Sequence, residues 1–118
     1  MKIWLRLGSA SMFLTIVLGA FGAHALKRRI EPEILEIFKT GVLYQAIHAL
    51  ALLVLAGLSE RYGKRLLPAG WLFVAGTVLF SGSLYILVLT GIKAWGAVTP
   101  LGGLCFLAGW AALFCVRE

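Results

Sequence analysis

Residues 40–58 read TGVLYQAIHALALLVLAGL, and this apolar stretch is long enough to cross a lipid bilayer. It nevertheless carries Tyr44, Gln45 and His48. Residues three and four positions apart share one helix face, and this spacing groups Gly41, Tyr44, Gln45, His48, Leu52 and Leu55. Because polar groups are costly in hydrocarbon, we expect this face to turn towards other helices and the rest of the chain to pack around it.

The composition of the 118-residue chain is typical of a membrane protein. Hydrophobic residues make up 61% of it, charged residues make up 14%, and the mean hydropathy is +0.96. Soluble domains are nearer half apolar and a quarter charged. One crossing of a bilayer needs about 20 apolar residues, and four uncharged runs of this length follow one another in the sequence. The predicted spans are about 3–26, 40–58, 67–90 and 97–116.

These spans predict an all-α membrane protein, a four-transmembrane-helix antiparallel bundle, with one domain covering residues 1–118. Residues 27–39 separate the first two spans, and Pro32 suits the first position of a helix. Glu33 lies early and Lys39 late, which matches the helix dipole. We therefore expect a short amphipathic helix between spans one and two, separate from span two or continuous with it, and a solvated loop is the alternative.

The start of the fourth span is open in the sequence. Thr99 and Pro100 are typical of a helix cap followed by proline in the first turn. Otherwise the helix begins near Ala94 and Pro100 kinks it. The first span has an alternative of its own, because Lys2 and Arg6 before an apolar centre resemble a signal peptide.

Basic residues flank the spans, which suits contact with anionic lipid headgroups and gives no surface for nucleic acid. With four spans both termini lie on one side, together with six Lys and Arg residues, and the other side has five. The positive-inside rule therefore favours cytoplasmic termini by one charge. The expected location is the cell inner membrane. Trp4 is placed like an interfacial tryptophan.

Small residues recur in spans one and four and predict close helix packing. They are Ser11, Thr15, Gly19, Ala23, Gly102, Gly103 and Gly109. Ordinary glycine and alanine content of membrane helices is the alternative explanation.

The strongly polar residues of the spans fall in the leaflet that adjoins residues 27–39 and 91–93 when the helices are threaded antiparallel. This candidate polar cluster or ligand-binding site consists of His24, Tyr44, Gln45, His48, Ser81, Ser83, Tyr85 and Thr99. One interpretation is a hydrogen-bonded network that fixes helix register. The other is a site for a lipophilic ligand, a quinone or a lipid headgroup.

Catalytic chemistry finds little support in the residues. The chain has no Asp, and its Glu residues lie outside the spans, so a proton pathway through carboxylates is not expected. No acid orients either His beside a nucleophile, and no catalytic residue is assigned. His24, His48 and Cys105 make a poor ligand set, so no metal is assigned either. The sequence favours a protein that is not an enzyme, and it identifies no cofactor.

Four ordered motifs carry a resemblance to a known family. They are LGAFGAH at 18–24, TG with YQA and His48 at 40–48, GTVLFSGSLY at 76–85, and TPLGG with FLAGW at 99–110. This order is similar to that of the domain-of-unknown-function 423 family, small bacterial inner-membrane proteins that include relatives of transmembrane protein 256. The resemblance implies a multi-pass membrane protein and no particular activity.

These observations favour a structural or accessory membrane protein that binds membrane lipids or a partner subunit, with a homo-oligomer as one possibility. A lipophile-, quinone- or haem-binding redox-type protein that uses the His24/His48 polar cluster is the first alternative. Haem would require the two histidines at one level of the bundle. A small oligomeric transporter is the second alternative.

Overall fold

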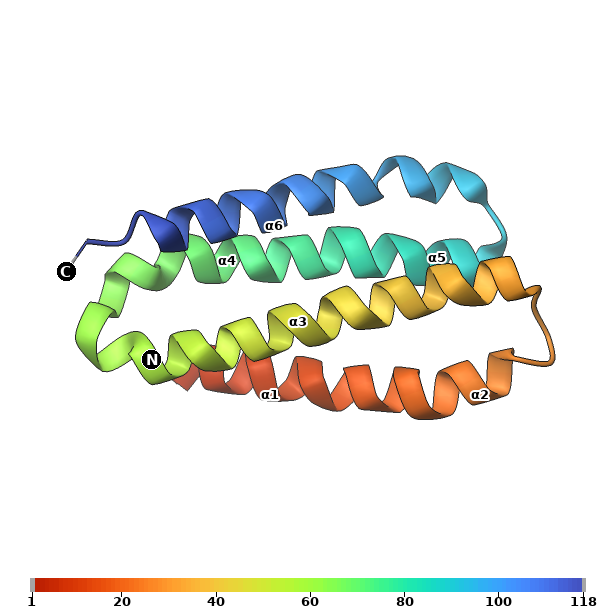
Figure 1. Ribbon diagram of the computed structural model, residues 1–118, viewed down its shortest axis with the longest axis horizontal. Helices are drawn as coiled ribbons and strands as arrows, with labels where there is room; N and C mark the ends of the chain where they lie inside the picture. The colour runs from red at the N-terminus through yellow and green to blue at the C-terminus, as the bar shows by residue number, and fades with distance from the viewer. Residues whose placement is uncertain (1, 118) are drawn as a thin grey trace.

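A computed structural model describes residues 2–117, and these residues form helices joined by short connections (Figure 1). The first rod consists of α1 (Lys2–Ile16), the π-helix η1 (Val17–Gly22) and α2 (Ala23–Leu26). The next is α3 (Pro32–Tyr62). After the 3₁₀ helix η2 (Gly63–Leu66) come α4 (Leu67–Gly76), the π-helix η3 (Thr77–Ser81) and α5 (Gly82–Thr90). The 3₁₀ helix η4 (Lys93–Ala97) precedes α6 (Thr99–Phe114).

The residues before the second predicted span form the start of α3 and not a separate interfacial helix. Pro32 occupies the first turn and Glu33 lies beside the helix N-terminus, both as expected. No helix breaker follows before residue 40, so α3 runs without interruption through the predicted span and ends at Tyr62. The predicted short amphipathic helix is therefore the first part of α3, and its Leu35 and Phe38 are buried.

The number of candidate membrane spans is three and not the expected four. The helical stretches that are long and apolar enough are Lys2–Leu26, Pro32–Thr90 and Lys93–Phe114. The second has 59 residues because the polar segment between the predicted spans 40–58 and 67–90 stays helical. Its direction changes at Gly63, where φ is 53°, a backbone conformation that favours glycine. The predicted count of four separate spans, and with it the four-helix bundle, is not supported by this finding.

The last helix has proline in its first turn. α6 begins at Thr99, with Pro100 among its first residues, and η4 precedes it. Of the two predicted starts, the one with proline in the first turn describes α6, and the η4 turns account for the helical residues before it. Thr99 is not the predicted cap, because Val98 occupies the cap position and no side chain caps the helix.

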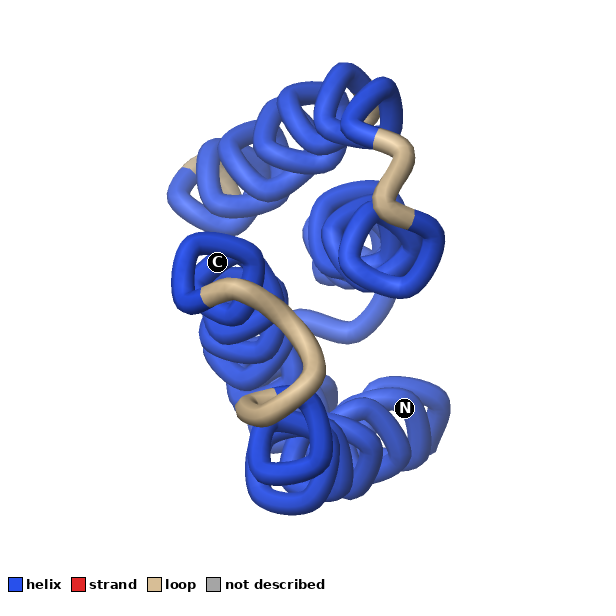
Figure 2. Tube along the Cα trace, turned by 90° about the vertical axis from the view of Figure 1, so that its right-hand side faces the viewer, coloured by secondary structure: helices blue, strands red, loops and turns tan. Residues whose placement is uncertain are grey.

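α3 lies at the centre of the structure. It packs against α1 on one side and against η3 and α5 on the other, and α6 packs against α4 and η3. Figure 2 shows this arrangement with the helices seen nearly end-on. Five residues of the expected face of α3 are buried, namely Gly41, Gln45, His48, Leu52 and Leu55. The sixth, Tyr44, lies at the edge of this face and is 38% exposed.

The apolar core lies at the end of the molecule that holds the N-terminus. Trp4 is fully buried there against other helices, and its predicted depth at the membrane interface stays a prediction. A Cβ atom on Gly70 would lie 2.3 Å from the Trp4 ring, which means that glycine at position 70 makes room for the indole. The ring of Trp71, half exposed, meets Trp4 edge-on at a centroid distance of 5.2 Å.

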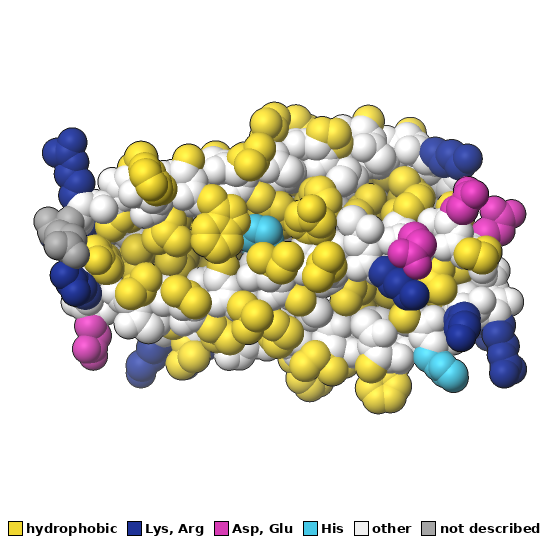
Figure 3. All heavy atoms as spheres, in the orientation of Figure 1, with side chains coloured by type: hydrophobic (Ala, Val, Ile, Leu, Met, Phe, Trp, Pro, Cys, Tyr) yellow, Lys and Arg dark blue, Asp and Glu magenta, His cyan; other side chains and the backbone are white. Residues whose placement is uncertain are grey.

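The face of the molecule drawn in Figure 3 is largely apolar, and most of its charged side chains lie towards the two ends. Large side chains such as Phe13, Phe21, Leu89 and Phe114 are 70% exposed or more. In water such a surface would drive aggregation, whereas in a bilayer it faces acyl chains. The exposed surface and the candidate spans together place the protein in a membrane.

Candidate functional site

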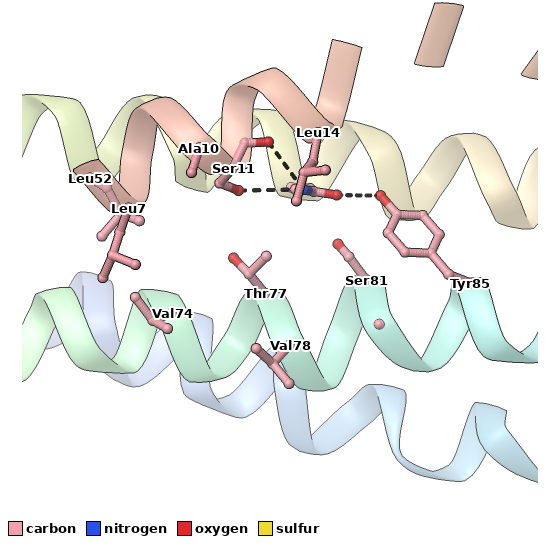
Figure 4. A pocket seen from close by; sticks show the side chains of 12 residues that line it. Leu7, Ala10, Ser11, Leu14, Leu52, Val74, Thr77, Val78, Ser81 and Tyr85 are labelled. Carbon is pink, nitrogen blue, oxygen red and sulfur yellow. Dashed lines mark hydrogen bonds between the residues drawn. The ribbon is translucent and has the colours of Figure 1, made fainter. Parts of the chain in front are cut away.

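Gln45 joins three helices through its amide group. Tyr85 of α5 donates its hydroxyl to Gln45 Oε1 at 2.6 Å (Figure 4). Gln45 Nε2 donates to the carbonyl oxygen of Ser11 in α1 at 3.2 Å and faces Ser11 Oγ at 3.4 Å. Both ends of a side chain that is 5% exposed are therefore bonded to neighbouring helices, as a buried amide requires.

Two buried serines make further bonds between helices. Ser81 in η3 donates its hydroxyl to the carbonyl oxygen of Gly41 in α3 at 2.6 Å. At Gly41 a Cβ atom would lie 2.9 Å from the Tyr85 ring, so the two helices approach closely at this point. Ser83 of α5 and Thr99 of α6 share a hydroxyl–hydroxyl bond of 2.6 Å.

His48 uses both ring nitrogens. Its Nδ1 lies 2.8 Å from the carbonyl oxygen of Tyr44, one turn earlier, and Trp110 of α6 donates its indole N–H to His48 Nε2 at 3.0 Å. Because a carbonyl only accepts and an indole N–H only donates, the neutral imidazole with its proton on Nδ1 satisfies both bonds. The ring also stacks on Phe106 at a centroid distance of 3.5 Å and an interplanar angle of 6°.

Further aromatic rings surround His48. The ring centroid of Phe73 in α4 lies 5.4 Å from that of the imidazole, and the ring centroids of Tyr44 and Phe80 are 4.6 Å apart. We call this set the His48 cluster: Tyr44, His48, Phe73, Phe80, Phe106 and Trp110. Tyr44 lies at its edge and is 38% exposed.

Glycines let the helices approach at the His48 cluster. Cβ atoms at Gly76 and Gly109 would lie 2.3 Å from Phe106 and 2.7 Å from Phe73. At Gly102 a Cβ atom would lie 2.3 Å from the backbone nitrogen of Phe80. Gly103, expected to pack in the same way, has open space.

The small residues expected in the first rod lie against α3. Thr15 is buried and donates its hydroxyl to the carbonyl oxygen of Ser11 at 2.7 Å. A Cβ atom on Gly19 would lie 3.1 Å from Val42, and Ala23 lines a shallow hollow beside the same residue.

His24 lies apart from the other predicted site residues. It is exposed on α2, whereas His48 is 3% exposed inside the bundle. The structure thus joins Gln45 with Tyr85, Ser83 with Thr99, and His48 with Tyr44, and leaves His24 outside. Within residues 2–117 no three His, Cys, Asp or Glu side chains are grouped as metal ligands would be.

Three important residues were not among the predicted site residues. Trp110, Phe106 and Phe73 surround His48, and Trp110 supplies its hydrogen bond. The signal that could have found Trp110 is its indole N–H, a donor that usually finds an acceptor when tryptophan lies inside a membrane helix.

A groove runs beside the Gln45 bonds, between α1 and the rod that contains η3. We call it the α1–η3 groove, and its volume is about 330 Å³. Its lining is mostly apolar and comes from α1, α3 and the α4–α5 rod (Figure 4). The lining residues are Leu7, Ala10, Ser11, Leu14, Gln45, Leu52, Val74, Thr77, Val78, Ser81, Gly82 and Tyr85.

Comparisons with known proteins agree with a location in a membrane. The family profile described as Protein of unknown function (DUF423) matches residues 18–103. The chain is 47% identical over 112 residues to the UPF0382 membrane protein YwdK of Bacillus subtilis, covering 93% of this chain and 91% of the relative. It is 43% identical over 113 residues to the UPF0382 membrane protein SAB0533 of Staphylococcus aureus, covering 96% and 93%. No solved structure has significant similarity to the chain. The resemblance seen in the four motifs is thereby confirmed, and the chain belongs to the DUF423 family of bacterial membrane proteins.

Proposed function

We propose that the stretch Pro32–Thr90 crosses the bilayer twice, so that residues 1–118 form one antiparallel domain of four membrane-spanning helices. A straight helix of 59 residues would be about 90 Å long, three times the thickness of the hydrocarbon core. The reversal at Gly63 supports two crossings, with α3 as one and the α4–α5 rod as the other. The polar residues 59–65 would then lie at an interface.

The proposed location is the cell inner membrane, with both termini in the cytoplasm. Under this topology Arg61, Lys64 and Arg65 lie on the same side as Lys2 and Arg6, and residues 27–39 lie on the opposite side. The excess of a single basic residue on the side of the termini supports this orientation.

The proposed role is that of a structural or accessory membrane protein that binds lipid or a partner subunit. The observation that carries it is the use of the buried polar groups: Gln45, Ser81 and Ser83 are bonded to other helices of the same chain. Such bonds fix helix packing. The apolar outer surface and the α1–η3 groove are then the parts that can meet lipid or another protein.

The redox-type alternative receives no support from the geometry. Haem or quinone chemistry through the two histidines would need them together, and His24 is exposed on α2 while both nitrogens of His48 are bonded within the chain. No observation favours the transporter alternative.

Thiol labelling tests the topology. Single cysteines replace Arg28, Lys64 or Lys93 in a chain with Cys105→Ser and Cys115→Ser, and whole cells are treated with a membrane-impermeant maleimide. We expect labelling at positions 28 and 93 and none at 64 until the cells are opened. Labelling of positions 64 and 93 from the same side would overturn the double crossing.

Reconstitution tests the accessory role. The purified chain in liposomes is expected to show neither flux of a panel of ions and solutes nor a visible absorption band. Photo-crosslinking in cells from the exposed Phe13 and Phe114 positions is expected to capture lipid or a membrane protein. Flux or substrate turnover by the purified chain alone would overturn the proposal.

A further inference from the structure

The α1–η3 groove opens where α1 diverges from the α4–α5 rod. Trp4 fills the space between the two near the N-terminus, packed on Gly70 and Trp71. Beyond Trp4 the two walls are separate, and Leu7 and Leu14 face Val74 and Val78 across the groove (Figure 4). The volume of about 330 Å³ falls within the range of small-molecule sites.

The polar atoms along the groove already have partners inside the protein. The Gln45 amide is bonded to Tyr85 and Ser11. The Thr77 hydroxyl donates to the carbonyl oxygen of Phe73 at 2.9 Å, and the Ser81 hydroxyl donates to Gly41. An occupant therefore needs no hydrogen-bonding groups of its own in the groove, which favours a hydrocarbon chain over a polar ring.

The end of the groove near the N-terminus has the features of a phosphate contact. Arg6 lies one turn before Ala10 on the α1 wall, is exposed, and forms no ion pair within the described residues 2–117. Trp71 lies two turns before Val78 on the opposite wall and is half exposed, as amphipathic indoles at headgroup depth are. Arginine and an indole N–H can both donate hydrogen bonds to phosphate oxygens.

The charges at this end favour an anionic occupant. Its basic residues are Lys2, Arg6, Arg61, Lys64, Arg65 and Arg117. Glu60 is the acidic residue of the described chain at the same end. A lipid with net negative charge is therefore attracted there, whereas a zwitterionic lipid gains little.

We propose that the α1–η3 groove binds one anionic phospholipid, with an acyl chain against Leu7, Leu14, Val74 and Val78 and its phosphate at Arg6 and Trp71. This inference rests on the proposed lipid-binding role and assigns the lipid class and its site. Because the groove is apolar and opens to the bilayer, its filling by a chain from the surrounding lipid costs no burial of polar groups.

Native mass spectrometry with matched lipids tests the site. The probes are phosphatidylglycerol and phosphatidylcholine with identical chains, added to the delipidated full-length protein. We expect one phosphatidylglycerol to bind about fivefold more tightly than phosphatidylcholine, the effect expected for one basic side chain near an anionic lipid. Equal binding of the two lipids would overturn the assignment of an anionic lipid.

Two pairs of variants locate the lipid. Gly82 lines the groove and Gly103 lies on α6, and a Cβ atom at either position meets nothing within 4 Å. Gly82→Leu is expected to fill the groove and weaken phosphatidylglycerol binding at least tenfold, and Gly103→Leu is expected to leave it unchanged. Arg6→Gln should abolish the preference between the two lipids, whereas Lys93→Gln, at the other end, should retain it.

The outcomes separate this site from the general role. If Gly82→Leu binds phosphatidylglycerol as tightly as the wild-type protein does, with unchanged helical content and melting temperature, the groove is not the binding site. A dimer that lacks bound lipid and is broken by Gly82→Leu would also overturn it, in favour of a second copy as occupant. Solute flux or turnover would instead overturn the accessory role, whatever the lipid measurements give.

Discussion

The two sides of α3 are packed in different ways. On the side of α4 and α6 lies the His48 cluster, where aromatic rings stack and glycines bring the helices together. On the side of α1 lies the Gln45 network, where a few hydrogen bonds cross beside an open groove. α1 has just three buried residues: Trp4, Gly8 and Thr15.

This difference indicates that the two sides of α3 have different roles within one small fold. The tight side, built on α3, α4 and α6, holds the helices by close contact of large surfaces. On the loose side α1 packs closely on α3, where a Cβ atom on Gly8 would lie 2.9 Å from Leu53, but α1 stays apart from the α4–α5 rod and leaves space for a molecule from the membrane. In a bilayer, where lipid is as apolar as leucine, packing and interhelical hydrogen bonds are the available forces, and both sides of α3 use both.

The largest expected effect comes from overpacking the tight side. Gly102→Ala places a Cβ atom 2.3 Å from the backbone nitrogen of Phe80, and backbone cannot move aside as a side chain can. We expect α6 to be displaced and the free energy of unfolding to fall by about 3 kcal/mol. Unfolding in mixed micelles, followed by circular dichroism, measures this change.

The matched substitution on the loose side is Gly82→Ala. Its Cβ atom meets nothing within 4 Å, so we expect no loss of stability and a small gain from helix propensity. Equal destabilisation by the two variants would contradict the difference in packing between the two sides.

An effect of similar size is expected at His48. His48→Ala removes a stacked ring and leaves the Trp110 indole N–H without its acceptor. Cavity formation and an unpaired donor each destabilise, and we expect a loss of about 3 kcal/mol, with a change in tryptophan fluorescence. His24→Ala is the control. Since His24 is exposed, its replacement should change the free energy of unfolding by less than about 0.5 kcal/mol.

Helix location and the buried face of α3 could be predicted from the sequence. Both follow from local properties, namely the length of apolar runs and the 3.6-residue period, and Gln45, His48 and Leu55 are buried as this period requires. The continuity of the helix beyond residue 58 was missed. Charged residues end an apolar run without ending a helix, and the glycine that reverses the chain lies at residue 63.

The positions of Trp4 and His24 could not be predicted, for two different reasons. Trp4 is buried because Gly70, in another rod, leaves space for it, and a single sequence does not reveal that pair. His24 follows the π-helix η1 (Val17–Gly22), in which the turn is wider than in an α-helix. Rise along the helix gives its depth, but α-helical spacing no longer gives the direction of its side chain.

The smallest expected effect comes from a variant that removes one hydrogen bond of the Gln45 network and leaves the packing in place. Tyr85→Phe removes the hydroxyl that donates to Gln45 and retains the ring, which packs beside Gly41 and lies 5.5 Å from Phe38. Hydrogen bonds between membrane helices average about 0.6 kcal/mol, so we expect a loss of this size, and a double-mutant cycle with Gln45→Leu should give a coupling energy of the same size. A coupling energy near zero would mean that the Tyr85–Gln45 bond adds nothing to the packing of α5 on α3. The bonds from Gln45 to Ser11 would then be the part of the Gln45 network that bears on the groove.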